Sequence, residues 1–151
     1  MKFTSINEEI LIQSEDVNKF SIKNFKIVSK RKPSSKQFKN LIFAFNVCRY
    51  VKSNAIVLTA NETTVGIGSG QPSRLDSCQI AINKMKKFIN PNNNIVAASD
   101  AFFPFVDGIE KLVQAGVVAV IQPSGSIRDK EIINYANQKD TVLIFSKTRL
   151  F

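Results

Sequence analysis

The sequence contains no histidine, and it has only two cysteines among its 151 residues. Without histidine, this chain alone cannot form a Ser-His or Cys-His catalytic pair, a histidine zinc site or an imidazole general base. Cys48 and Cys78 fall on the apolar faces of predicted helices, with no second ligand near either in the sequence. We therefore predict two free thiols in the core, and neither a disulfide framework nor a metal motif.

Long apolar runs are also absent. No run approaches the ~20 residues that span a bilayer, and the opening residues lack the apolar segment of a signal peptide. We therefore expect a cytoplasmic protein without a membrane partner. With 44% apolar residues, a chain of this length is expected to form one domain around one core.

Charge is unbalanced, with 21 lysines and arginines against 12 acidic residues and a net charge of +9. The basic residues form short clusters at 30–32 and 84–87, on a predicted loop and at a predicted helix end. Lysines in the last turn of a helix complement its dipole, so a solvated face explains them better than a nucleic-acid site. We expect no nucleic-acid partner.

Apolar periodicity predicts strands that alternate with helices along most of the chain. Such alternation implies an α/β protein with helices on both faces of a mixed, largely parallel sheet, preceded by an N-terminal antiparallel hairpin. We expect an extended segment over residues 1–32 and the main domain over 33–151. The predicted strands are 9–13, 25–29, 55–58, 63–67, 95–98, 117–121 and 141–145, and the predicted helices begin at Ser34 (as N-cap), Pro72, Asp107 and Ser126. Ser34 and Gln37 are expected to form a capping box, and turns are expected at residues 61–62 and 122–125. Gly116 is the expected C-terminal cap of the third helix, and Ile89 is expected on the apolar face of the second.

The segment GIGSGQPSR, residues 66–74, follows a predicted strand and begins a helix. As a bare pattern it matches neither common nucleotide-binding glycine motif, so a simple strand-to-helix turn is one interpretation. Arg74 favours another, because a guanidinium in the first turn of a helix is badly placed for the dipole. It is expected to be held there for an anion or a carboxylate.

The segment SDAFFPFVD, residues 99–107, places three aromatic residues around a proline directly after a strand. These rings can form a hydrophobic plug at the end of the sheet. They can equally form a stacking wall for a flat heteroaromatic ligand. Asp107 is a candidate helix cap or a polar contact for such a ligand.

Four segments in one order, KSNAIV, GIGSGQPSR, SDAFFPF and IQPSGSIRD, resemble the C-terminal part of AICAR transformylase. That protein is the formyl-transfer half of a bifunctional purine-biosynthesis enzyme whose other half is IMP cyclohydrolase. The resemblance covers residues 25–151. It implies a three-layer, cytidine-deaminase-like module, the second of two such modules in the family. The zinc signature of deaminases is absent from the sequence, so no zinc is expected.

The resemblance also implies site residues. It matches Asn54, Arg74, Phe102 and Arg149 to residues that bind AICAR ribonucleotide, and Phe105 and Asp107 to the site for 10-formyltetrahydrofolate. A solvated terminal arginine is the alternative for Arg149. Supporting roles are expected for Lys52 and Asp107.

Potassium is implied only weakly. Ser53 and Asp100 match positions near a potassium site in some relatives. Neighbouring positions carry Val51 and Ala55, which have no side-chain oxygen.

Catalysis in the family uses a Lys-His pair of the first module, and this chain lacks it. The resemblance therefore implies a folate-dependent formyltransferase module that needs a first module or subunit, and whose sites between subunits imply a homodimer. The alternatives are a non-catalytic nucleotide-binding or regulatory domain, and an inactive remnant of the enzyme.

Overall fold

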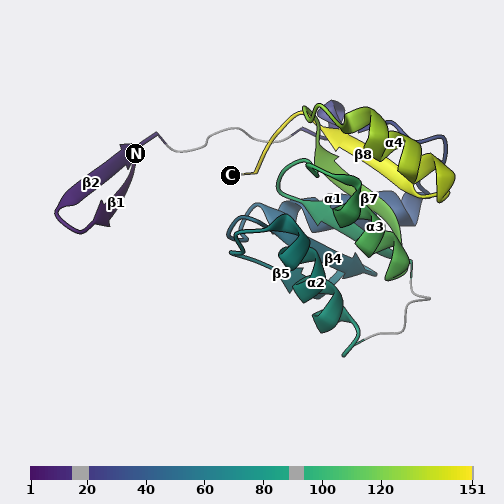
Figure 1. Cartoon of the computed structure of the whole chain (residues 1–151), viewed down its shortest axis with the longest axis horizontal. Helices are drawn as coiled ribbons and strands as arrows, with labels where there is room; N and C mark the ends of the chain where they lie inside the picture. Colours follow the sequence, from purple (N-terminus) through teal and green to yellow (C-terminus); the bar gives the residue numbers. More distant parts are fainter. Residues whose placement is uncertain (15–20, 89–93, 151) are drawn as a thin grey trace.

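The computed structural model describes residues 1–14, 21–88 and 94–150. Ile89, predicted on the apolar face of the second helix, lies outside these residues. The elements, shown in Figure 1, are β1 (Lys2–Ile6), β2 (Glu9–Gln13), the 3-10 helix η1 (Ile22–Asn24), β3 (Lys26–Ile27), α1 (Ser35–Cys48), β4 (Ile56–Ala60), β5 (Thr63–Gly68), α2 (Arg74–Met85), β6 (Ile95–Ser99), α3 (Val106–Gln114), β7 (Val117–Pro123), α4 (Asp129–Gln138) and β8 (Val142–Ser146).

The main sheet has six strands in the order β3-β8-β7-β6-β4-β5. Parallel pairing is confined to β6, β7 and β8. The pairs β3–β8, β4–β5 and β4–β6 are antiparallel. The sheet is therefore mixed, as predicted, but antiparallel pairs outnumber parallel ones among the described strands, so it is less parallel than expected. Because β6 and β7 run in the same direction, the segments that follow them leave the sheet at the same end of the strands.

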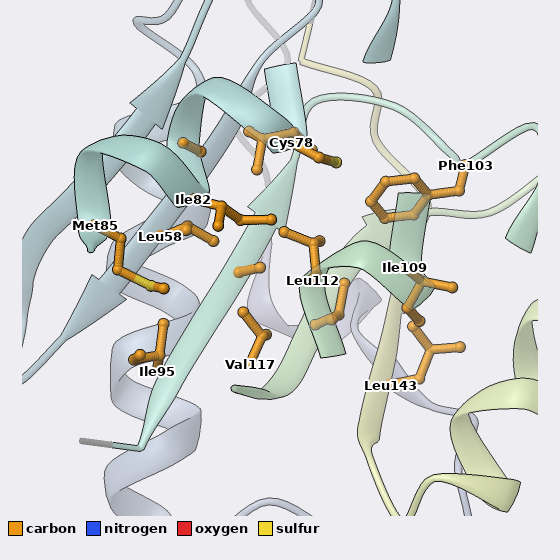
Figure 2. Packing of buried hydrophobic residues seen from close by; sticks show 14 of the residues in the cluster. Leu58, Cys78, Ile82, Met85, Ile95, Phe103, Ile109, Leu112, Val117 and Leu143 are labelled. Carbon is orange, nitrogen blue, oxygen red and sulfur yellow. The ribbon is translucent and has the colours of Figure 1, made fainter. Parts of the chain in front are cut away.

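The predicted three layers are confirmed by two apolar clusters, one on each face of the sheet. Helix α1 packs on one face through Leu41, Phe45 and Cys48. Helices α2, α3 and α4 cover the other face. Figure 2 shows this second cluster, in which Ile82 and Met85 of α2 and Leu112 of α3 point toward the strands. Helices thus cover both faces of the sheet. A ligand can therefore bind only at the ends of the strands or along an edge strand.

Local sequence signals account for the ends of several elements. The predicted capping box of α1 is present: Ser34 accepts from the Gln37 backbone N–H, and the Gln37 side chain accepts from the Ser34 N–H. A two-residue turn joins β4 to β5, with positive φ at both Asn61 and Glu62. Gly116, with φ of 93°, follows the C-terminal cap of α3 as predicted.

Three predicted boundaries are wrong. Helix α2 begins at Arg74 instead of Pro72, because the Asn54 side chain binds the carbonyl oxygens of residues 71 and 72 and holds them outside the helix. Strand β7 continues through Gln122 and Pro123, which were predicted to form a turn. Helix α4 begins at Asp129 instead of after Ser126, because the Asp129 carboxylate accepts from the backbone N–H groups of residues 125 and 126.

The N-terminal hairpin is present, but its first strand, β1, was not predicted. Strand β2 was predicted with its observed bounds and pairs with β1 in a separate two-stranded sheet. The predicted strand 25–29 is reduced to β3, which joins the main sheet beside β8. Figure 1 shows the hairpin lying apart from the main sheet and its helices.

Both cysteines are free and fully buried, as predicted. Burial raises the pKa of the Cys78 thiol to about 12 and also raises the pKa of Cys48. Both thiols are therefore protonated at neutral pH and behave as apolar core groups. Among the described residues, no helix is long and apolar enough to cross a membrane.

Candidate functional site

A cavity of about 460 Å³ opens where the segment before β4 and the loops after β5 and β6 meet the first turns of α2 and α3 and the segment after β8. All six residues predicted to bind the nucleotide or the folate line this cavity. They come from four separate stretches of the chain and are Asn54, Arg74, Phe102, Phe105, Asp107 and Arg149.

Arg74 forms the floor of the cavity and is held by protein groups. Its Nη1 donates to the Ser99 Oγ at 3.0 Å and forms an ion pair with the Asp100 carboxylate. The Asp100 side chain is 1% exposed and that of Arg74 is 9% exposed. Water screens such a pair little, so the two charges attract each other more strongly than in an ion pair at the surface, and loss of either one leaves a buried charge unpaired. The expectation that Arg74 is held for an anion or a carboxylate is met by a carboxylate of the protein itself.

Asn54 links this ion pair to the start of α2. Its Oδ1 accepts from the Arg74 Nη2 at 2.8 Å, and its Nδ2 donates to the carbonyl oxygens of Gln71 and Pro72 at 2.8 and 3.1 Å. Its backbone carbonyl also accepts from the Ser77 Oγ at 2.7 Å. These bonds fix the glycine-containing loop against β4 and orient the guanidinium of Arg74.

The sequence left two interpretations of the aromatic segment after β6, a hydrophobic plug and a stacking wall for a ligand. Its residues fit both. Phe103 is the plug: it is 1% exposed and packs beneath α3. A Cβ on Gly108 would lie 2.4 Å from the Phe103 Cδ1, so this close approach requires glycine. Phe102 and Phe105 line the cavity, and Phe105 is 51% exposed. These two rings offer apolar faces to a ligand.

Two guanidinium groups stack on these rings. The Arg149 Cζ lies 5.1 Å from the centre of the Phe102 ring, and the Arg128 Cζ lies 4.9 Å from the centre of the Phe105 ring. Arg128 also forms an exposed ion pair with Glu131 at 3.1 Å. Arg149 is exposed and has no acidic partner in the described part of the chain. Of the two arginines that line the cavity, Arg149 is thus the one whose charge is available to an anion.

Asp107 lies in the first turn of α3, where a carboxylate complements the helix dipole. It is not the cap, which was one of the two interpretations of the sequence, because the N-cap residue is Phe105. Its Oδ1 accepts from the Gly108 backbone N–H at 2.7 Å. Asp107 and Arg149 both line the cavity, so the cavity carries one negative and one positive side chain in addition to the paired Arg74.

Lys52, Ser53 and Asp100 do not line the cavity. The Lys52 carbonyl accepts from the Gly70 backbone N–H at 2.8 Å, so this residue contributes to the glycine-containing loop through its backbone. The Asp100 Oδ2 is buried without a hydrogen bond, and it fits as one oxygen ligand for a cation. The described residues contain no group of three or more Cys, Asp or Glu side chains that could hold a metal.

Sequence reasoning missed three residues around the site. Ser99 bridges Arg74 and the Ala101 carbonyl. Gln122, fully buried on β7, accepts from the Phe103 backbone N–H at 3.4 Å and supports the aromatic segment. Arg128 lies in the segment IQPSGSIRD, but its contact with Phe105 crosses 23 positions and follows from the parallel pairing of β6 with β7. A polar residue at the end of an apolar strand was the available signal for Gln122.

Among the curated proteins that are similar to this chain, two match along its whole length. Both are named bifunctional purine biosynthesis protein PurH. The protein of Buchnera aphidicola subsp. Schizaphis graminum (strain Sg) is 46% identical over 153 residues, which cover 100% of this chain. That of Chlorobium phaeobacteroides (strain BS1) is 43% identical over 150 residues, which cover 99% of this chain. In each case the chain spans 29% of the relative's length.

Among solved structures, the apo dCMP deaminase of the cyanophage S-TIM5 superposes with a TM-score of 0.48 at 16% identity, covering 74% of this chain and 98% of the deaminase. The model of the AICARFT/IMPCHase bienzyme family matches residues 1–84, which include Asn54 and Arg74 and are more than half of the chain. By this match, and by the identity with the PurH proteins along the whole sequence, the chain belongs to the AICARFT/IMPCHase bienzyme family.

Proposed function

We propose that this chain is a substrate-binding module of the formyl-transfer half of the family, acting in purine biosynthesis. It binds AICAR ribonucleotide through Asn54, Arg74, Phe102 and Arg149. It binds 10-formyltetrahydrofolate beside Phe105 and Asp107. The observation that carries the proposal is that these six residues, drawn from four stretches of the sequence, line one cavity.

The chemistry of the cavity suits a phosphorylated imidazole. The face of Phe102 suits a flat heteroaromatic ring, and the guanidinium of Arg149 supplies a positive charge beside it. We assign the phosphate to Arg149, because Arg74 is already paired with Asp100. Arg74 then acts on the ligand mainly by holding Asn54 in position.

The reaction needs more groups than this chain provides. Formyl transfer to a weakly nucleophilic aromatic amine needs a base for the amine, a proton donor for the folate nitrogen and stabilisation of an oxyanion. The sequence has no histidine. The proposal therefore includes a second polypeptide or module that carries a Lys-His pair, and a homodimeric assembly.

Potassium has no assigned step in this proposal. Asp100 provides one buried oxygen toward such an ion, and its other oxygen is paired with Arg74. Ser53 adds a hydroxyl from the preceding loop, whereas Val51 and Ala55 add none.

Calorimetry with AICAR ribonucleotide and with the corresponding nucleoside, which lacks the phosphate, tests the binding proposal. The ribonucleotide is expected to bind at least tenfold more tightly than the nucleoside. Arg149→Gln is expected to remove this difference, and Arg128→Gln, at a stacked arginine outside the cavity lining, is the matched control. Absence of ribonucleotide binding would contradict the proposal.

A formyl-transfer assay tests the catalytic part. The chain alone is expected to be inactive. Activity is expected when it is mixed with a first-module polypeptide that carries the Lys-His pair. Tight ribonucleotide binding without activity in any such mixture would favour the non-catalytic nucleotide-binding domain instead.

A further inference from the structure

The segment that follows β8 is held by hydrogen bonds on both sides of Arg149. Before it, the Ser146 Oγ donates to the Thr148 carbonyl oxygen at 3.0 Å. After it, the Leu150 backbone N–H donates to the Asp100 carbonyl oxygen at 3.0 Å. Arg149 therefore lies in a short stretch of chain whose path is fixed from either end.

Leu150 adds an apolar contact to this backbone bond. Its side chain is partly buried and packs against the apolar cluster between α1 and the sheet. Arg149, one position earlier, is exposed and lines the cavity, with its Cζ 5.1 Å from the centre of the Phe102 ring. The two neighbouring side chains thus lie in different environments. Burial of Leu150 in the cluster limits the directions in which Arg149 can point.

Asp100 connects this segment to the floor of the cavity. Its carboxylate forms the ion pair with Arg74, while its backbone carbonyl accepts from the Leu150 N–H. Its own backbone N–H donates to the Ala55 carbonyl oxygen at 3.3 Å, and the residue is 1% exposed. The group that anchors Leu150 is therefore a buried part of the scaffold, bonded through both its backbone and its side chain.

We propose that Leu150 is a positioning residue, which holds the Arg149 guanidinium over Phe102 before the ligand arrives. A mobile arginine side chain loses much rotamer freedom when it binds an anion. An arginine that is already placed loses less, so more of its attraction for the anion appears as affinity. The inference rests on the proposed function, since the anion that Arg149 meets there is the phosphate of the ribonucleotide.

Calorimetry with AICAR ribonucleotide and with its nucleoside measures the effect on phosphate binding. Leu150→Ala removes the apolar anchor and keeps the charge of Arg149. It is expected to weaken ribonucleotide binding about fivefold or more and to leave nucleoside binding unchanged. Leu150→Met conserves volume and apolar character, so it is expected to bind both ligands as the unmodified chain does. An equal loss of affinity for the two ligands in Leu150→Ala would overturn the proposal, because it would indicate a general disturbance of the cavity.

The matched control is Val47→Ala. Val47 packs against the same apolar cluster from α1 and does not line the cavity. Its truncation is expected to lower the stability of the chain without changing the ratio of the two affinities, and circular dichroism confirms that each variant is folded. A change in this ratio as large as that in Leu150→Ala would also overturn the proposal, because any loss of packing in the cluster would then displace Arg149.

The placement of Arg149 can also be measured by NMR without a ligand. An aromatic ring shifts the signals of protons that lie over its face, so the protons on the Arg149 Cδ report its stacking on Phe102. The signals in Leu150→Ala are expected to approach those in Phe102→Leu, which lacks the ring, whereas Leu150→Met should match the unmodified chain. Ring-shifted signals that persist in Leu150→Ala would overturn the proposal. If the unmodified chain binds no ribonucleotide, the proposed function is contradicted, and these spectra alone decide the role of Leu150.

Discussion

The floor and the rim of the cavity both carry arginines, but the protein treats them differently. On the floor, Arg74 is buried and its guanidinium donates to Asn54, Ser99 and Asp100. On the rim, Arg149 lines the cavity and Arg128 lies just outside the lining; both are exposed and stack on aromatic rings. The floor is therefore part of the folded scaffold, whereas the rim is open to a ligand.

This difference follows from solvation. A buried guanidinium without a partner carries a large desolvation cost, so its hydrogen bonds must be made within the protein. An exposed guanidinium loses little when its ion partner is missing, because water solvates it. The same residue type thus contributes mainly to stability in one place and mainly to binding in the other.

The largest expected effect comes from breaking the floor. Asp100→Ala leaves Arg74 buried without its ion partner and should lower the free energy of unfolding by about 3–5 kcal/mol. Urea denaturation measures this change. In the double variant with Arg74→Met, no unpaired charge remains and much of the loss should be recovered. Equal stability of the single and double variants would show that the loss in Asp100→Ala does not come from the unpaired charge of Arg74.

An intermediate effect is expected where α2, which begins with Arg74, packs on β5. A Cβ on Gly68 would lie 1.9 Å from the Ser77 carbonyl oxygen, so Gly68→Ala forces the helix away from the strand. Thermal and urea unfolding should show a loss of about 1–3 kcal/mol, the usual cost of overpacking. Thr63→Ala, at the exposed start of the same strand, serves as the control. An unchanged free energy of unfolding would mean that α2 can shift away from β5 without loss of stability, and that Arg74 keeps its hydrogen bonds when it does.

The smallest effect on stability is expected at the rim. Arg149→Gln and Arg128→Gln should each change the free energy of unfolding by less than about 0.5 kcal/mol, because both side chains are exposed. Paired urea titrations with the unmodified chain measure this. A loss of more than about 1 kcal/mol at either position would remove the distinction between floor and rim.

The sequence predicted the helices and strands well where periodicity and capping agree. The capping box at Ser34 and the turn at Asn61 and Glu62 are local signals, and both were recognised. The start of α4 was wrong because the Asp129 side chain bonds to the loop before the helix. Strand β1 was missed because polar residues interrupt its apolar alternation and its partner is another exposed strand.

By itself, the sequence determined the layers and the buried cysteines, because apolar periodicity is a property of the chain, and its resemblance to the family supplied six of the residues that line the cavity. Only the tertiary structure decided which arginine is paired and which is open. That distinction depends on the ion pair between Asp100 and Arg74, which lie 26 positions apart in the sequence and come together at the same end of the strands. Burial then makes their attraction strong, while Arg149 remains in water.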